Sequence, residues 1–268
     1  MTGPNKQPPS WPIEVTGLSI TPVKGTRLRT VDSITLGPTG VRENRRFFLI
    51  DDKDEMVNAT HLGELQTIVS DYDDVERRLS LTFPGGRVLE DEVRLGAEVM
   101  TSFYKQPLPA RLLEGDWSDA ISEHTAKPLR LVEADENGAV DRRAAGAVTI
   151  ISRASLAGLA EHAELDRVDG RRFRMLIEVD GVGAHEEDQW VGRTLRVGEA
   201  VLRGGGHVGR CVITSRDPES GEVTLHTLKV LGGYRRDLDT TEPIAFGIYG
   251  EIVRPGTIRV GDQVSVDG

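Results

Sequence analysis

Cysteine is nearly absent from this chain of 268 residues, which holds a single thiol at Cys211. One cysteine excludes an internal disulfide, and it excludes an iron–sulfur cluster held by four cysteines of the chain. It also excludes the usual structural zinc patterns, because those need paired cysteines. Any sulfur chemistry of this chain alone therefore depends on Cys211.

Long apolar runs and a surplus of basic charge are missing as well. No apolar stretch approaches the roughly 20 residues that span a bilayer, and residues 1–12, MTGPNKQPPSWP, lack the apolar segment of a signal peptide. We therefore expect residues 1–12 to form a disordered tail, and the protein to be cytoplasmic and without membrane contact. The 33 basic and 43 acidic residues give a net charge of −10. This charge argues against nucleic acid as a partner, because nucleic-acid binders present a basic surface.

What the chain does contain is a succession of short β-branched and apolar runs separated by Gly, Pro and Asp. Two of its segments, 194–201 and 257–264, share the pattern T-[LI]-R-V-G-[ED]-x-V, whose Val-Gly-acid turn predicts a β-hairpin in each. The runs as a whole predict strands at 13–23, 45–52, 77–86, 128–135, 173–181, 193–204, 210–217 and 222–230.

Helical signals are fewer. The strongest is 152–166, with Ser152 as its N-cap, and a second is 116–125, with Ser118 as its cap. A third, 60–68, is weakened by an internal glycine. The balance predicts a mainly β (α+β) fold, a β-barrel with a few inserted helices, rather than a doubly wound α/β sheet.

A polar stretch with an internal glycine, ENGAVDRRAAG at 136–146, is the predicted linker. It separates a predicted N-terminal β-barrel-like domain at 13–135 from a C-terminal β-barrel domain at 147–268. We expect the two to pack together.

Gly204, Gly206 and Gly209 spell G-x-G-x-x-G, the spacing of a dinucleotide-binding loop. In that motif a strand precedes the glycines and a helix follows them, so that phosphate meets the helix N-terminus. Here the following RCVITS is β-branched and extended in character. We reject the nucleotide fingerprint and interpret the segment as a glycine-rich loop between strands, through which the backbone can approach a ligand.

Cys211 follows these glycines and allows two interpretations. Composition alone favours a small buried hydrophobic residue. Against this, Arg210 and His207 supply positive charge that would favour the thiolate, the form that binds metals and attacks electrophiles. The six histidines have no metal-binding spacing, and no nucleophile motif accompanies the cysteine, so neither a zinc hydrolase nor a cysteine hydrolase is favoured.

Basic residues gather at the predicted strand entrances. Lys24 lies in TPVKG, Arg46 opens RFFLI, and Arg171, Arg172 and Arg174 lead into MLIEVDG. Guanidinium groups pair bidentately with phosphate oxygens, so the set suits a phosphate-bearing ligand. For any one of these arginines, pairing with a carboxylate of this acidic chain is the favoured alternative.

Several segments together resemble the MOSC superfamily in its two-part form, the branch that reduces N-hydroxylated compounds. The most specific are the R-C-x-x-T-x-x-D-P run and the closing P-G-T-I-R-V-G-D run. The matching segments are SITPVKG (19–25), RFFLIDDKDEMVNAT (46–60), TIISRASLAGL (149–159), RRFRMLIEVDG (171–181), EEDQWVGRTLRVGEAVL (186–202), GRCVITSRDPESGEV (209–223) and FGIYGEIVRPGTIRVGDQV (246–264).

The resemblance implies a pyranopterin molybdenum cofactor held in a cleft between the two domains, with Cys211 as the thiolate ligand of the metal. A soft thiolate suits such a sulfur-rich centre. The departures from the family pattern are Gly25 and Leu176, with Thr60 standing where the family has arginine. The other residues that the resemblance assigns to the pterin or its phosphate are Lys24, Arg46, Thr60, Ser152, Arg172, Arg174 and Arg210.

The implied function is a molybdenum-dependent reductase that removes oxygen from a small N-hydroxylated or N-oxide compound. Electrons would come from a separate protein, because the chain lacks the iron–sulfur domain of some members. Asp188 would deliver protons, or it is a solvated loop carboxylate. Two alternatives stay open: a cofactor carrier or sulfur-transfer protein that uses a Cys211 persulfide, and a scaffold that has lost its cofactor.

Overall fold

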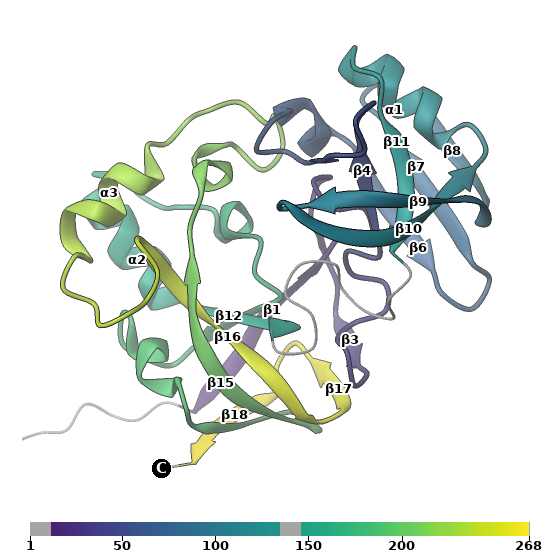
Figure 1. The fold of residues 1–268 in the computed structure, drawn as a ribbon. Helices are drawn as coiled ribbons and strands as arrows, with labels where there is room; N and C mark the ends of the chain where they lie inside the picture. The colour runs from purple at the N-terminus through teal and green to yellow at the C-terminus, as the bar shows by residue number, and fades with distance from the viewer. Residues whose placement is uncertain (1–11, 135–145, 268) are drawn as a thin grey trace, which may run out of the picture.

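The computed structural model describes residues 12–134 and 146–267. They form two lobes, a closed barrel built mainly from the C-terminal half and an N-terminal lobe of smaller sheets (Figure 1). The mainly β fold is confirmed. The tail at 1–12 and the linker at 136–146 lie almost wholly outside the described residues, so the domain limits at 13–135 and 147–268 stay predictions.

Seven strands close the barrel in the order β13-β12-β16-β15-β14-β18-β1, and β1 pairs back with β13. Side chains such as Leu18, Ile177 and Leu202 are buried in its interior. Because β1 comes from the start of the described chain, the barrel draws on both halves of the sequence. The strands are β1 (Ile13–Ile20), β12 (Val148–Ser152), β13 (Ile177–Asp180), β14 (Thr194–Val197), β15 (Ala200–Gly209), β16 (Ala245–Arg254) and β18 (Gln263–Asp267), with the short β2 (Arg29–Thr30) beside β1.

Helices α2 (Arg153–His162) and α3 (Thr227–Tyr234) pack against the barrel. The Ser152 Oγ accepts a hydrogen bond from the Ser155 N–H, so the predicted N-cap of α2 is confirmed. Leu159 and Leu231 of the two helices belong to one buried cluster with Phe246 of β16. Short 3-10 turns, η3 (Gly170–Phe173), η4 (Glu186–Trp190) and η5 (Val212–Ser215), connect the surrounding strands.

The N-terminal lobe contains a five-stranded sheet, β5-β4-β11-β10-β9, and a three-stranded sheet, β6-β7-β8. Phe47 from the first sheet and Leu79 from the second share one core with Trp117 of α1 (Trp117–Thr125). The strands are β4 (Phe47–Ile50), β5 (Met56–Val57), β6 (Val69–Asp73), β7 (Arg78–Thr82), β8 (Val88–Glu92), β9 (Arg94–Phe103), β10 (Gln106–Glu114) and β11 (Arg130–Ala134). A separate ladder of β3 (Ser33–Leu36) with β17 (Gly256–Arg259) pairs a segment from each half of the sequence.

The two weaker helix predictions need correction. Residues 116–125 do form α1, but Ser118 is not its cap: Asp116 occupies that position, and the Ser118 Oγ accepts a hydrogen bond from the Leu131 N–H at 3.0 Å. At 60–68 there is only a 3-10 turn, η1 (Gly63–Thr67). No helix in the described parts of the chain is both long and apolar enough to cross a bilayer.

Two predicted strands are wrong. Residues 210–217 hold η5, because Thr214 bonds back to the Cys211 carbonyl through both its N–H and its hydroxyl. Residues 222–230 run into α3, where the Thr227 hydroxyl donates to the Thr214 carbonyl at 2.8 Å. Tertiary contacts around these short β-branched runs override their local preference for extended backbone.

The hairpin at 194–201 is confirmed, because β14 and β15 pair directly around Gly198. The hairpin at 257–264 is wrong: β17 pairs with β3, whereas β18 pairs with β14. The glycine-rich loop is wrong as well, because Gly204, Gly206 and Gly209 all lie within β15. At Gly204 the backbone of Trp190 and Val191 passes so close that a side chain has no room.

Candidate functional site

Cys211 lies two residues after the last residue of β15, with Arg210 between them, and directly precedes η5. Its side chain is exposed, so its interpretation as a buried core residue is wrong. Ile213, two residues on, packs against the hydrophobic core of the N-terminal lobe. The turn that carries the thiol is therefore held against the opposite lobe.

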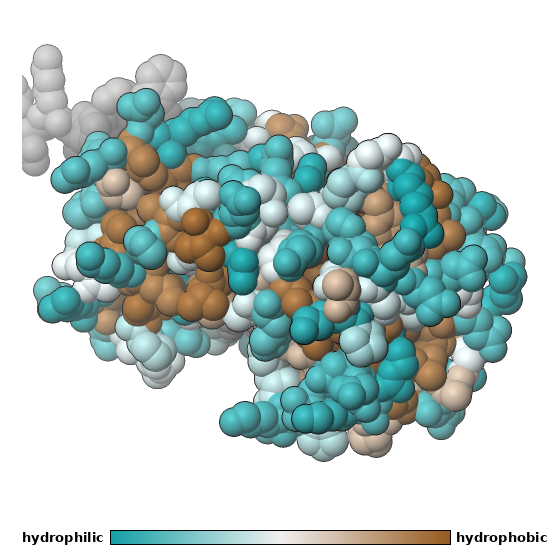
Figure 2. All heavy atoms as spheres, turned by 90° about the horizontal axis from the view of Figure 1, so that it is seen from above, coloured by the Kyte–Doolittle hydropathy of each residue, from teal (hydrophilic) through white to brown (hydrophobic). Residues whose placement is uncertain are grey.

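The thiol borders a groove of about 280 Å³. Cys211 comes from the barrel lobe, and the other walls come from the N-terminal lobe. One wall is the segment after β5, and the other is the tip of the β9–β10 hairpin, which points toward the middle of the molecule (Figure 1). The space-filling view from above shows the hollow between the lobes, with hydrophilic residues over most of that face (Figure 2). The lining residues are Glu55, Met56, Asn58, Thr60, His61, Ser102, Tyr104, Lys105 and Cys211.

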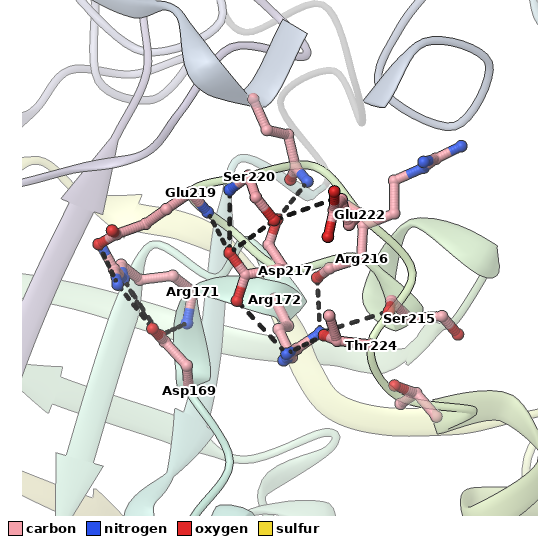
Figure 3. A network of polar contacts seen from close by, with 12 residues as sticks. Asp169, Arg171, Arg172, Ser215, Arg216, Asp217, Glu219, Ser220, Glu222 and Thr224 are labelled. Atoms are coloured by element: carbon pink, nitrogen blue, oxygen red, sulfur yellow. Dashed lines mark hydrogen bonds and ion pairs between the residues drawn. The ribbon is translucent and has the colours of Figure 1, made fainter. Parts of the chain in front are cut away.

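From the last residue of η5 onward the chain forms a loop, residues 215–224, which Arg172 contacts from below in the view of Figure 3. Its guanidinium donates to the Arg216 carbonyl at 2.7 Å and to the Thr224 hydroxyl at 2.6 Å. Asp217 accepts from the Ser220 N–H and hydroxyl, and the backbone bond is the main reason why the pKa of Asp217 is lowered. Burial lowers the pKa of Arg172.

A second set of contacts ties the same loop to the N-terminal lobe. The Gln66 amide donates to the Asp217 carbonyl at 2.9 Å, and Arg27 donates to the Glu219 carbonyl at 2.9 Å. Arg216 bonds to the Gly221 carbonyl within the loop, and at 3.4 Å to the carbonyl of Thr60 in the groove wall. Among the residues that the structure describes, the buried Nε of Arg216 has no hydrogen-bond partner.

Of the residues assigned to the cofactor, Thr60 and Lys24 lie at or beside the groove. Thr60 is part of its lining. Lys24 is buried, and its ammonium lies 5.4 Å from the ring centre of Tyr104 and 5.7 Å from that of Phe103. Cation–π contacts with these two rings therefore hold the Lys24 ammonium next to the groove wall formed by the hairpin tip.

Arg174 and Arg210 contact backbone near the lobe interface. Arg174, in a left-handed conformation, donates to the Thr26 carbonyl at 2.7 Å. Arg210, next to the cysteine, donates to the carbonyls of Phe246 and Phe173. These bonds position η3 and β16 around the start of the Cys211 turn.

Arg46, Ser152 and Asp188 are not among the groove residues. Arg46 forms ion pairs with Glu133 and Asp74 in the N-terminal lobe. Ser152 is fully buried and bonded to the Glu187 carboxylate at 2.9 Å. No comparison tests the roles that the resemblance assigns to these residues, and those roles stay predictions.

Asp188 lies in a buried polar cluster beneath α3. It accepts from Arg235 at 2.8 Å and is 3.7 Å from the His207 Nε2. Burial, followed by the charge of Arg235, lowers the pKa of the neighbouring His185 to about 4. Burial raises the pKa of Tyr234 to about 12. His185 and Tyr234 are therefore held in their neutral forms beside the Asp188–Arg235 ion pair.

The sequence reasoning missed Tyr104, Lys105, His61 and Asp217. Asp-Pro at 217–218 is a turn signal that pointed to the loop. Nothing local in the sequence marks the Tyr104–Lys105 turn, because its importance arises only when the hairpin meets the other lobe. Within residues 12–134 and 146–267, no three His, Cys, Asp or Glu side chains gather into a metal-binding group.

The sequence of the chain matches a known protein family and several known proteins. The MOSC domain model matches residues 135–265. Mitochondrial amidoxime-reducing component 1 of Homo sapiens is 35% identical over 126 residues, which are 44% of this chain and 36% of the human protein, so the match spans about a third of that relative. The same-named protein of Xenopus laevis is 24% identical over 283 residues, 93% of this chain and 81% of that one.

Among solved structures, the YUAD protein from Bacillus subtilis aligns over 96% of each chain, at 13% identity and a TM-score of 0.43. YiiM from Geobacillus stearothermophilus aligns over 46% of this chain and 55% of that one, at 13% identity and a TM-score of 0.33. The family assignment rests on the sequence match over the C-terminal half. The chain carries a MOSC domain at residues 135–265.

Proposed function

We propose that the chain is a molybdenum-cofactor-dependent reductase of N-hydroxylated or N-oxide compounds, with electrons supplied by a separate protein. The MOSC match and the amidoxime-reducing relatives support the broader statement, a protein related to the molybdenum cofactor. The single observation that carries the finer proposal is the exposed Cys211 thiol bordering a groove between the two lobes.

The residues present fit such a group. A thiolate is a soft ligand and suits a sulfur-rich metal centre. Around it, the unpartnered buried Nε of Arg216, the ammonium of Lys24 behind Tyr104, and Lys105 in the lining offer positive charge and a donor to an anionic cofactor. In the proposal, Cys211 anchors the metal while Thr60 and the cations hold the organic part.

When bound, the cofactor would supply the redox centre at which the N–O bond is reduced. The overall conversion takes an N-hydroxylated compound, two electrons and two protons to the reduced nitrogen compound and water. The chain must supply a path for these protons. Glu55 and His61 line the groove and are suited to hold them, whereas Asp188 is bound to Arg235 outside the groove lining.

The decisive experiment measures molybdenum in protein purified from cells that make the cofactor. Wild type should contain stoichiometric molybdenum, and Cys211→Ala should lose it. Val212→Ala is the matched control, because the neighbouring side chain is also exposed but has no metal-binding atom. Wild type without molybdenum would contradict the proposal. Loaded wild type is then assayed for reduction of an amidoxime or a hydroxylamine with an artificial electron donor.

Exposure of the same thiol also supports a second candidate, sulfur transfer through a Cys211 persulfide. The Cys211 thiolate would take the outer sulfur from a donor persulfide, which leaves as a thiolate, and pass it to an acceptor. Intact-mass measurement after incubation with a persulfide donor checks this. One added sulfur in wild type, absent from Cys211→Ala, together with no reductase activity of the loaded protein, would favour transfer over reduction.

A further inference from the structure

The turn between β9 and β10 has an unusual composition for its geometry. It consists of two residues, Tyr104 and Lys105, and the flanking Phe103 and Gln106 pair with each other. Both turn residues have positive φ, 49° and 64°. Two-residue turns of this kind strongly prefer Asn-Gly or Asp-Gly, because a Cβ is costly in the left-handed region. Turn formation therefore does not account for tyrosine and lysine here.

Tyr104 is also not used as a core residue. Its side chain is 62% exposed, although it is large and aromatic. Its ring packs edge-on against Phe103 at 5.0 Å, and Phe103 packs edge-on against the buried Phe48 at 5.3 Å. These ring contacts and the nearby Lys24 ammonium fix the position of the exposed Tyr104 side chain.

The fixed position is beside the thiol. Ser102, Tyr104 and Lys105 line the groove that contains Cys211. The hairpin tip is tied to the opposite wall as well, because the Ser102 N–H donates to the Asp54 carbonyl at 2.8 Å. The positive φ angles of Tyr104 and Lys105 strain the backbone at this groove wall, and turn formation does not explain them. Strain of this kind points to a function of the two side chains.

We propose that the Tyr104–Lys105 turn is the specificity-determining wall of the Cys211 groove, where the Tyr104 ring admits small groups to the thiol and excludes bulky ones. The inference deepens the proposed function and rests on it only for the identity of the substrate. The wall itself acts on any molecule that approaches Cys211, whether or not a cofactor is bound.

Because Cys211 is the only thiol of the chain, alkylation rates measure access to this one atom. The test uses full-length protein made in cells that lack the molybdenum cofactor and compares a small reagent, iodoacetamide, with a bulky one, N-pyrenylmaleimide. The variant Tyr104→Asn/Lys105→Gly removes both side chains and installs the preferred residues for the turn. Tyr104→Phe keeps the ring and is the matched control.

We expect the double variant to raise the ratio of the bulky to the small reagent's rate by about fivefold or more, the effect of removing a steric barrier of about 1 kcal/mol. Tyr104→Phe should keep the wild-type ratio. An unchanged ratio in a double variant that unfolds cooperatively would overturn the inference. If that variant does not fold, the same ratio of alkylation rates is measured for Tyr104→Asn alone, and an unchanged ratio there would overturn the inference. Asparagine is suitable because it tolerates positive φ.

A second measurement separates this inference from the proposed function. In loaded protein the measurement uses Tyr104→Asn alone, because Lys105 is one of the cations proposed to hold the cofactor. This variant should lower the KM for bulky N-hydroxylated compounds relative to the KM for hydroxylamine. If no variant contains molybdenum while the alkylation ratio still shifts, the role of the Tyr104–Lys105 wall is supported and the reductase proposal is contradicted. If molybdenum and activity are present while neither the alkylation ratio nor the KM ratio shifts, the role of the wall is contradicted and the reductase proposal is retained.

Discussion

The backbones of Gly63 and Gly221 meet at the contact between the two lobes, and neither residue has room for a side chain. A Cβ built on either glycine would collide with the carbonyl oxygen of the other. Gly63 opens η1 in the N-terminal lobe, and Gly221 belongs to the loop that follows the Cys211 turn. The glycine pair therefore sets how closely that loop approaches the groove wall.

Gly221→Ala should lower the free energy of unfolding by about 3 kcal/mol or more, because it combines a collision with a positive φ of 74°. Gly192→Ala is the matched control: its φ is 81°, and nothing lies within 4 Å of the added Cβ. The control should lose only about 1–2 kcal/mol, from conformation alone. Urea denaturation measures both variants. If both lose the same free energy of unfolding, the close contact between Gly63 and Gly221 contributes nothing to stability.

Arg172 should act as a structural support of the Cys211 segment. Arg172→Met removes its bonds to the Arg216 carbonyl and the Thr224 hydroxyl, and should lower the free energy of unfolding by about 2–3 kcal/mol. Arg153→Met, which breaks an exposed ion pair with Glu178, should cost about 1 kcal/mol or less.

Both arginine variants are measured by denaturation of cofactor-free protein. A role limited to cofactor binding predicts that Arg172→Met has wild-type stability without cofactor and a lower molybdenum content. That outcome would refute the structural role.

Ser152→Ala should destabilise the protein without removing molybdenum. The variant loses the N-cap of α2, which costs about 1 kcal/mol, and it takes a donor from the buried Glu187 carboxylate, for a total of about 2–3 kcal/mol. A phosphate at this helix N-terminus would lie beside that carboxylate, which is unfavourable. Thermal denaturation and metal analysis of the folded variant check this. Loss of molybdenum would instead support the sequence prediction that Ser152 holds the cofactor phosphate.

Stability should fall as the pH is lowered from about 6.5 to about 4, because of His185. Its pKa is lowered from 6.5 to about 4 in the folded protein, by burial and then by Arg235. Between these pH values His185 is protonated in the unfolded chain but neutral in the folded protein. The free energy of unfolding therefore decreases as the pH falls, and this decrease is complete below about pH 4. His185→Gln should flatten the slope between these values.

Much of the barrel was predictable because it depends on local patterns. The Val-Gly-Glu turn at 197–199 predicted its hairpin correctly, although the same pattern at 257–264 forms none. Ser152 marks the start of α2 through a bond within the first turn of that helix. The R-C-x-x-T run led to Cys211 by resemblance. Its exposure was not predictable, because it depends on Ile213 packing into the other lobe.

The arginines illustrate what local patterns leave open. Arg46 and Arg172 stand in similar basic contexts, yet one pairs with Glu133 and the other supports the loop at 215–224. Their partners are distant in sequence, and only the assembled fold selects among the many carboxylates and carbonyls available. The helix α3 was missed for the same reason, since its short apolar run acquires helical contacts only against α2 and η5.

The position of β1 has a consequence for how the protein is made. This first strand pairs with β13 and β18, so Ile13 lies opposite Val264 near the other end of the chain. At a synthesis rate of roughly 5–20 residues per second, β1 waits on the order of ten seconds on the ribosome before its partner β13 is made. Val15 and Leu18, fully buried in the finished barrel, spend that time without their final neighbours. The nascent chain is therefore open to misassociation at β1, and its barrel closes only after β18 has been made.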